Sequence, residues 1–236
     1  MTEGTGLRAR VRAQLMGEFK AEARRQLADQ GAPGLSLRAV TRALGMAPSA
    51  IYRYFPNRDE LLTALIVDAY DSLGVLAEAA DGRCEPSDFG GRWVAVGRRV
   101  RDWAVARPHE YALVYGSPVP GYSAPPATVG PASRITLVLA AIVGDAHRAG
   151  ALEIPPAEGE LTAETRADAE RIAAAAMPGV PAHVVVRALE AWTQLFGYVS
   201  FELFGHFAGV VEDPAALFER SLLDMGTYVG LPRPAT

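Results

Sequence analysis

Apolar residues recur at helical spacing along most of the chain, and no segment alternates as a half-buried strand would. Near the N-terminus the apolar positions fall four residues apart, which places them on one face of a helix. These positions are Leu7, Val11, Leu15, Phe19, Ala23 and Leu27. Gly31, Pro33 and Gly34 follow and end the pattern. The pattern predicts a long first helix that buries one face.

Two short helices are predicted after the first. Ser36 is suited to cap the second helix, and Gly45 ends it. Pro48 fits the first turn of a third helix, where its missing N–H costs nothing, and Pro56 ends that helix after about seven residues. The small core beneath them is expected to contain Val40, Leu44, Met46 and Ile51. Three helices with a Gly-containing turn between the last two predict a helix-turn-helix unit.

Long helices are predicted for the rest of the chain. Asn57 and Glu60 suit a capping box at the start of a fourth helix. Its buried face is expected to comprise Leu61, Leu62, Leu65, Ile66, Ala69, Tyr70, Leu73 and Leu76. Further helices are expected over residues 89–107, 108–115, 131–149, 161–176, 181–208 and from 213 onward. The predicted fold is all-α, with a helix-turn-helix DNA-binding domain over residues 1–57 and a larger helical effector-binding and dimerisation domain over residues 58–236.

Charge is spread unevenly along the chain. Residues 1–60 contain ten Arg and Lys against six Asp and Glu, whereas the whole chain has 23 against 27 and a net charge of −4. A basic head joined to an acidic body favours a polyanionic partner at one end only. A solvated basic face would give the same distribution, so charge alone leaves both interpretations open.

Candidate nucleic-acid-binding residues gather on and beside the predicted third helix. They are Arg38, Arg42, Pro48, Ser49, Ala50, Tyr52, Arg53, Tyr54 and Arg58. Tyrosine hydroxyls can bond phosphate oxygens, and arginine can hold phosphate or pair with guanine. Arg58 also stands at a predicted helix N-terminus, where free backbone N–H groups favour a phosphate. The alternative is that Tyr52 and Tyr54 pack beneath the first helix.

The segment GLSLRAVTRALGMAPSAIYRYFPNRDELLTAL closely resembles the DNA-binding head of TetR/AcrR-family transcriptional regulators. The Leu44-Gly45 turn and residues 51–55 and 57–61 carry the resemblance, which covers residues 7–75. The family usually has Lys where Arg58 stands, and often Gly, Ser or Thr near residues 48–50. The resemblance implies an all-α homodimer whose two heads bind a palindromic operator in successive major grooves. It also implies a C-terminal domain that binds a small effector and thereby releases DNA.

Residues 187–207 are apolar nearly all round, so a helix here needs cover on every side. The last predicted helix is its natural partner, and two helices from each subunit would form a four-helix dimer interface. That interface is expected to comprise Leu195, Val199, Leu203, Leu217, Leu222 and Met225.

The stretches AWTQLFGYVSFEL and RPHEYALVYG resemble a C-terminal sensor type marked by a Trp-x-x-x-His-Gly pattern. Trp192 and Gly197 match that pattern. Phe196 stands where the pattern has His, so no role of that His is carried over.

Aromatic and apolar residues between the head and the expected dimer face are candidates for an effector pocket, because such pockets are mostly apolar with a few polar groups. The candidates are Trp93, Trp103, Tyr111, Tyr115, Leu139, Val143, His147, Trp192 and Phe196. An ordinary core would contain the same residue types. The predicted function is a dimeric repressor that responds to a small apolar or aromatic effector. The alternative is a DNA-binding dimer with no small-molecule effector.

An enzyme with a helical body is not expected, because the sequence has no metal-spaced His and Cys set, no nucleophile–base arrangement and no phosphate loop. We therefore assign no catalytic residue, metal site or cofactor. The lone Cys84 and an N-terminus without the apolar core of a signal peptide predict a cytoplasmic location. Residues 135–143 are too few to span a membrane, and Glu202 interrupts residues 191–211, so no membrane partner is expected. The Pro-rich segment 117–131 is expected to be a loop that either gates the pocket or forms plain surface, and plain surface is favoured.

Overall fold

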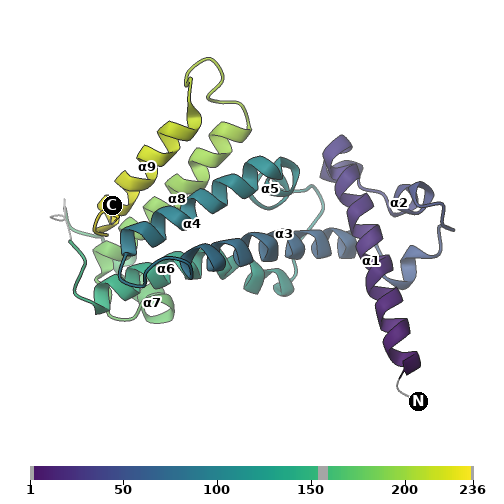
Figure 1. Ribbon diagram of the computed structural model, residues 1–236, viewed down its shortest axis with the longest axis horizontal. Helices are drawn as coiled ribbons and strands as arrows, with labels where there is room; N and C mark the ends of the chain where they lie inside the picture. The colour runs from purple at the N-terminus through teal and green to yellow at the C-terminus, as the bar shows by residue number, and fades with distance from the viewer. Residues whose placement is uncertain (1–2, 154–158, 235–236) are drawn as a thin grey trace. The chain divides into compact units, whose positions relative to one another are not determined.

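The computed structural model describes residues 3–153 and 159–234, with the backbone alone for residues 3–7. Every regular element in these residues is helical, which confirms the all-α prediction (Figure 1). The α-helices are α1 (Glu3–Gln30), α2 (Leu37–Ala43), α3 (Arg58–Asp81), α4 (Phe89–Ala106), α5 (Pro108–Tyr115), α6 (Val129–Arg148), α7 (Ala163–Ala176), α8 (Ala182–Leu203) and α9 (Pro214–Val229). Three short 3₁₀ turns accompany them, η1 (Ala32–Gly34), η2 (Ile51–Arg53) and η3 (Pro126–Thr128).

The chain divides into two compact units. The first comprises Met1–Tyr70 and Arg107–Pro131, and the second comprises Asp71–Ala106 and Ala132–Thr236. The first unit therefore extends beyond residue 57, where the sequence placed the boundary. It takes in the first half of α3, the whole of α5 and the Pro-rich segment.

The predicted helix ends of the first unit have the expected chemistry. Ser36 caps α2, since its hydroxyl oxygen accepts from the backbone N–H of Ala39 at 3.4 Å. Asn57 caps α3 by accepting from the backbone N–H of Glu60 at 2.9 Å. Gly45, which ends the turn after α2, has a φ of 65°, and no atom lies within 4 Å of where its Cβ would be. The left-handed backbone, rather than crowding, therefore favours glycine here.

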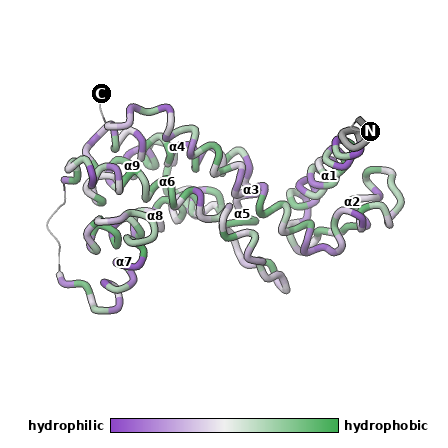
Figure 2. The backbone as a smooth tube through the Cα atoms, turned by 90° about the horizontal axis from the view of Figure 1, so that it is seen from below, coloured by the Kyte–Doolittle hydropathy of each residue, from purple (hydrophilic) through white to green (hydrophobic). Residues whose placement is uncertain are grey.

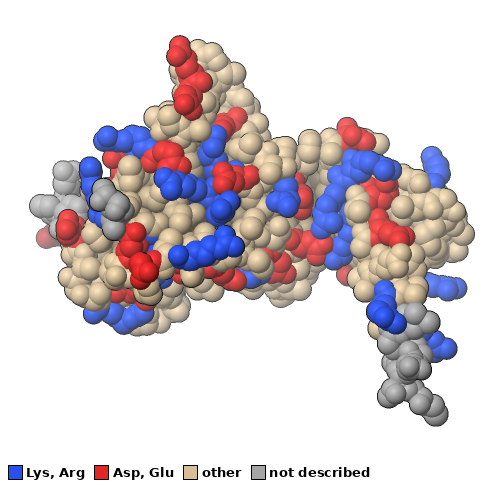
Figure 3. All heavy atoms as spheres, viewed as in Figure 1, with Lys and Arg blue, Asp and Glu red and all other residues tan. Residues whose placement is uncertain are grey.

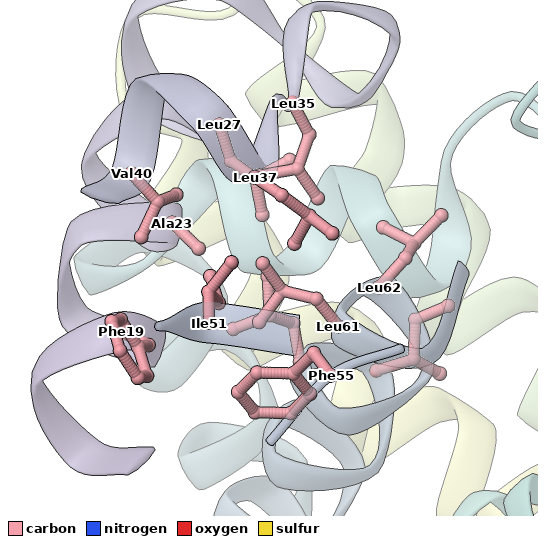
Figure 4. Close-up of a cluster of buried hydrophobic side chains, with 12 residues drawn as sticks. Phe19, Ala23, Leu27, Leu35, Leu37, Val40, Ile51, Phe55, Leu61 and Leu62 are labelled. Atoms are coloured by element: carbon pink, nitrogen blue, oxygen red, sulfur yellow. The ribbon is translucent and has the colours of Figure 1, made fainter. Parts of the chain in front are cut away.

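The core of the first unit is a single apolar cluster beneath α1 and α2 (Figure 4). Its twelve buried residues are Phe19, Ala23, Leu27, Leu35, Leu37, Val40, Ile51, Phe55, Leu61, Leu62, Leu65 and Ile66. Leu44 and Met46 are partly buried and pack against it. The apolar face of α1 is buried only from its middle onward, because Val11 is 47% exposed. The side chain of Leu7, predicted to share that face, lies outside the described residues.

The third helix differs from its prediction. Residues 48–50 form turns and only η2 follows, so no α-helix stands between Pro48 and Pro56. The N–H of Ala50 bonds the carbonyl of Ala47, and that of Tyr54 bonds the carbonyl of Ile51, both across three residues. The N–H of Phe55 also bonds the carbonyl of Ile51 across four residues, so the segment has isolated 3₁₀ and α-type turns rather than a continuous α-helical ladder.

The second unit is built from the later part of α3 with α4 and α6–α9. Hydrophilic and hydrophobic residues alternate along its helices (Figure 2). Helices α8 and α9 lie side by side and antiparallel, since Tyr198 donates to the carbonyl of Pro214 at 2.7 Å while Tyr228 bonds Glu190 (Figure 1). Leu76 was predicted to belong to the buried face of α3, but its side chain is 36% exposed.

One helical stretch, Pro126–Arg148, is long and apolar enough by length and composition to cross a membrane, with a mean hydropathy of 1.5. The sequence analysis counted only residues 135–143 and judged them too few. In the structure 44% of the apolar 18-residue window in this stretch is buried, and Ile135, Ile142 and Val143 belong to the core. Core helices of water-soluble proteins pass the same test, so the stretch is weak evidence for a membrane span.

Candidate nucleic-acid interface and effector site

The recognition segment, residues 47–54, presents most of the predicted DNA-contacting side chains to solvent. Ile51 is fully buried and anchors the segment to the core of the first unit. Pro48, Ser49 and Arg53 are exposed around it, and Ala50 is half-buried. The exposed surface of the segment is therefore short, small and largely apolar apart from Ser49 and Arg53, which suits close approach to base edges.

The two tyrosines of this segment have different surroundings. Tyr52 is 45% exposed, and no hydrogen bond engages its hydroxyl among the described residues. Tyr54 packs against α1, with its ring centroid 5.4 Å from that of Phe19 and the guanidinium of Arg12 5.0 Å above it. The structure thus favours the phosphate-contact interpretation for Tyr52 and the packing interpretation for Tyr54.

The basic residues of the first unit fall into two groups. Those on the later turns of α1 have acidic partners: Lys20 and Arg24 both bond Asp68, at 2.8 and 2.6 Å. Other exposed arginines have no ion pair among the described residues. They are Arg8, Arg10, Arg12, Arg38, Arg42 and Arg53. Positively charged atoms project from the surface around α1 and α2 in Figure 3. Unpaired cations are the ones available to phosphates.

Arg58 is held within the first unit rather than presented freely. Its guanidinium donates to the carbonyl of Ala32 at 2.7 Å, and lies 3.4 Å from the carboxylate of Asp59. The side chain is 31% exposed. This contact ties the start of α3 to η1, a role that the sequence analysis did not predict. Since a guanidinium has five N–H donors, a phosphate contact at Arg58 stays a prediction.

A small, partly open apolar cavity of about 40 Å³ lies in the second unit. Three predicted pocket residues line it, namely Trp93, Leu139 and Trp192. The other lining residues are Thr136, Ala140, Ile172, Ala176, Met177, Ala188 and Leu189. No charged side chain lines the cavity, so it suits a neutral, apolar guest.

An open groove of about 500 Å³ lies between α7 and α8 of the same unit. Its lining residues are Thr165, Asp168, Ala169, Val186, Leu189, Glu190, Thr193 and Gln194. Leu189 lines both the groove and the small cavity. This side chain therefore stands between the cavity and solvent.

The remaining predicted pocket residues do not line this cavity. Trp103 is buried and donates its indole N–H to the hydroxyl of Ser72 at 3.1 Å. Val143 is fully buried, and His147 lies against the turn at Gly179. Phe196 packs on Trp192, with ring centroids 6.0 Å apart.

Tyr111 and Tyr115 belong to the first unit, where their rings are 5.2 Å apart. Tyr70 completes this cluster, with its ring 5.9 Å from that of Tyr115 and its hydroxyl donating to the carbonyl of Val114 at 3.1 Å. Burial raises the pKa of the Tyr70 and Tyr115 phenols, because the charged phenolate would be poorly solvated there. The sequence predicted Tyr111 and Tyr115 as pocket residues, and in the structure they lie in the first unit.

Two family models match the chain. The model described as "Bacterial regulatory proteins, tetR family" matches residues 21–65, which contain the recognition segment. The model described as "Tetracyclin repressor-like, C-terminal domain" matches residues 93–225, more than half of the 236 residues. The chain belongs to the TetR family. Membership in the Trp-x-x-x-His-Gly sensor type stays a prediction.

Individual TetR-family relatives agree with these matches over nearly the whole chain. The HTH-type transcriptional regulator Rv1816 of Mycobacterium tuberculosis is 40% identical over 222 residues, covering 91% of this chain and 92% of its own. The HTH-type transcriptional regulator Mb1846 of Mycobacterium bovis has the same identity and coverage. The crystal structure of SCO4313 is similar with a TM-score of 0.76 at 35% identity, over 92% of this chain and 97% of that one. This TetR-family protein is a transcriptional regulator with a DNA-binding domain.

The residues predicted for the TetR-family dimer interface need correction. Leu195, Val199, Leu222 and Met225 are at most 1% exposed within one protomer, so they form its core and are not available to a partner. Leu203 is half-buried, and Leu217 is 41% exposed. The sequence pattern could not separate the two faces of α8, because that helix is apolar nearly all round.

A different set of side chains forms the exposed stripe of α8 and α9. On α8 these are Glu190, Gln194, Gly197 and Phe201, and on α9 they are Leu217, Asp224 and Tyr228, with Ser221 half-buried among them. Both sets have the spacing of one helix face, and the bond between Tyr228 and Glu190 places the two faces side by side. Glycine at the exposed position 197 leaves this face flat. The sequence signal that could have indicated this stripe is the spacing of small and polar residues at three and four positions along each helix.

The Pro-rich segment is not plain surface. Val119 and Tyr122 pack against the apolar core of the DNA-binding head, and the hydroxyls of Tyr122 and Thr63 are 2.8 Å apart. In α5, Glu110 lies 3.5 Å from the guanidinium of Arg24 on α1. These contacts attach Arg107–Pro131 to the TetR-family head, as its place in the first unit requires.

Proposed function

We propose that this TetR-family regulator is a dimeric repressor released from a palindromic operator by a small, neutral, apolar effector. The observation that carries the proposal is the small apolar cavity lined by Trp93, Leu139 and Trp192 without any charged side chain. Pockets for small molecules are mostly apolar with a few placed polar groups, and the lining residues offer the Thr136 hydroxyl and the indole N–H of Trp93, which is buried and has no hydrogen-bond partner among the described residues.

The size of the cavity favours a small effector and an entry step. Pockets for drug-sized ligands have volumes of roughly 300–1,000 Å³, far above the 40 Å³ of this cavity. The adjoining groove of about 500 Å³ shares Leu189 with the cavity. A change in the rotamer of Leu189 would join the two volumes, so we propose that the effector enters from the α7 side of the groove, at Thr165 and Asp168, because Glu190 and Gln194 on its α8 side belong to the exposed stripe.

The coupling to DNA is proposed to run through chain connectivity. Helices α4 and α6 of the second unit lead directly into and out of Arg107–Pro131, which is attached to the DNA-binding head by Tyr122 and Glu110. An effector that shifts α4 or α6 would therefore displace a segment bonded to the head. By linkage, an effector that weakens DNA binding must itself bind more weakly to the DNA complex, by the same factor.

Dimerisation is proposed to use the exposed stripe of α8 and α9. A two-fold axis across this stripe would pair it with itself, bury Phe201 and Leu217, and form a four-helix interface. Two heads related by that axis would contact two half-sites of a palindrome in successive major grooves.

Native mass spectrometry followed by an effector screen tests the proposal. We expect the purified protein to be a dimer, and neutral aromatic or aliphatic compounds to raise its melting temperature and weaken DNA binding. Leu189→Trp, which fills the mouth of the cavity, is expected to abolish the ligand-induced shift while DNA binding remains. Leu137→Trp, at an exposed position on α6, is the matched control. If no compound shifts melting or DNA binding in wild type, the alternative of a DNA-binding dimer without an effector is favoured.

A further inference from the structure

The N-terminal extension of α1, residues 8–14, lies outside the packed part of the first unit. All seven residues are exposed, and the first fully buried side chain of the helix is Phe19. At 1.5 Å per residue, Arg8 lies roughly 16 Å along the helix axis from Phe19. Apolar burial therefore contributes little to holding this extension in place. We look for its role in the charge of its side chains.

The extension carries a concentrated and uncompensated positive charge. Arg8, Arg10 and Arg12 fall within five residues, and none has an ion pair among the described residues. The next acidic residue along the helix is Glu18, which accepts from Gln14 at 2.9 Å. By contrast, Lys20 and Arg24 further along α1 are paired with Asp68. Three like charges on a solvated helix repel one another, and a polyanion would relieve that repulsion.

A specific contact joins this charge to the recognition segment. The guanidinium of Arg12 stacks over the ring of Tyr54 at 5.0 Å, and that ring is held in turn by Phe19. Tyr54 directly follows η2, which carries the exposed side chains of Tyr52 and Arg53. Arg12 is therefore fixed at the edge of the recognition segment. Arg8 lies one turn further out on the same helix face.

We propose that residues 8–14 of α1 form a second DNA contact, in which Arg8, Arg10 and Arg12 hold phosphates of the duplex next to the bases approached by the recognition segment. Duplex DNA is the chosen partner, rather than an anionic membrane, because Arg12 is built into the edge of the DNA-binding head. The contact adds affinity and salt dependence but no base specificity, since phosphates carry no sequence information. The inference rests on DNA binding by this head.

The salt dependence of binding to two duplexes tests this contact. The triple variant R8Q/R10Q/R12Q removes the charge and keeps good helix formers. The control R83Q/R166Q/R233Q removes the same charge from exposed, unpaired positions elsewhere in the described chain. Each protein is titrated between roughly 50 and 200 mM salt with a duplex selected from a random pool by wild type, and with the same duplex trimmed to its core.

On the long duplex we expect the log–log salt slope of the triple variant to fall by roughly 0.9 for each arginine that leaves a phosphate, counted over both subunits. The control should keep the wild-type slope, and trimming the duplex should remove the difference. Melting of the triple variant should fall only slightly below that of the control, because the contact of exposed Arg12 with the Tyr54 ring is a weak cation–π interaction. Equal salt slopes for the triple variant and its control would overturn the proposal. It would also be overturned if the triple variant lost binding to anionic lipid vesicles while its salt slope on DNA stayed at the wild-type value. Failure of wild type to bind any duplex would instead overturn DNA binding by the head.

Discussion

At the scale of single residues, Tyr52 and Arg58 stand in opposite surroundings although both are candidate phosphate contacts. Tyr52 is 45% exposed, and its hydroxyl has no hydrogen bond among the described residues. Arg58 donates to the carbonyl of Ala32 and joins α3 to η1. The same candidate role therefore predicts different consequences for the two side chains when they are removed.

Tyr52→Ala is expected to weaken DNA binding by about 1 kcal/mol, the contribution of one hydrogen bond, and to leave the melting temperature unchanged. Arg58→Ala is expected to lower the free energy of unfolding by about 1 kcal/mol, because the bond to Ala32 is lost from a partly exposed site. Chemical denaturation and fluorescence anisotropy measure the two quantities. If Arg58→Ala lowers the salt slope by about one with full stability, Arg58 belongs among the phosphate contacts instead.

At the scale of elements, α5 and the Pro-rich segment behave as part of the DNA-binding unit. Their tyrosines pack with Tyr70 of α3, and Tyr122 bonds Thr63. A segment rich in proline has little regular backbone hydrogen bonding of its own, so its side chains hold it in place. This packing makes the segment part of the first unit, between α4 and α6 in sequence.

The tyrosine cluster predicts a loss of stability at alkaline pH. The pKa of Tyr70 and Tyr115 is raised in the folded protein, so both phenols ionise at lower pH in the unfolded chain. Their contribution is fully present below the ordinary phenol pKa of about 10 and is lost as pH rises above it. We expect the double variant Tyr70→Phe, Tyr115→Phe to show a smaller decline in melting temperature above pH ~10 than wild type. Parallel declines in the two proteins would refute the assignment.

At the scale of the whole molecule, the proposed dimer uses a flat, mixed stripe rather than the most apolar residues of α8 and α9. Those residues, such as Leu195 and Leu222, are already used in the core of one protomer. A solvent-exposed Phe201 at 53% and Leu217 at 41% are what the protomer leaves for a partner. Most of the binding energy of an interface comes from a few such side chains near its centre.

Phe201→Asp is expected to convert the dimer into a folded monomer, because it places an unpaired charge in the buried part of the proposed interface. Leu137→Asp, at a position that is 50% exposed on α6, should remain dimeric. Light scattering measures the mass, and circular dichroism checks the fold. A Phe201→Asp variant that stays dimeric at low concentration would place the interface elsewhere. Monomers should also bind a palindromic operator far more weakly, since each then contacts only one half-site.

The sequence by itself determined the helical architecture of this protein and the location of its DNA-binding head. The helix ends at Ser36, Gly45 and Asn57 depend on hydrogen bonds and backbone angles set by residues adjacent in sequence. Charge along the chain likewise marked residues 1–60 as the basic end. Local patterns of this kind survive without knowledge of the fold.

Only the tertiary structure decided which apolar residues are buried and which charged residues are paired, among residues that look alike in the sequence. Hydrophobic periodicity does not distinguish Leu195 in the core from Phe201 at the surface, because both are apolar on one helix that is covered on several sides. Composition does not show that Arg58 bonds Ala32 while Arg53 has no partner in the described chain. Such differences depend on which segments meet in space, and contacts between residues far apart in sequence leave no local pattern.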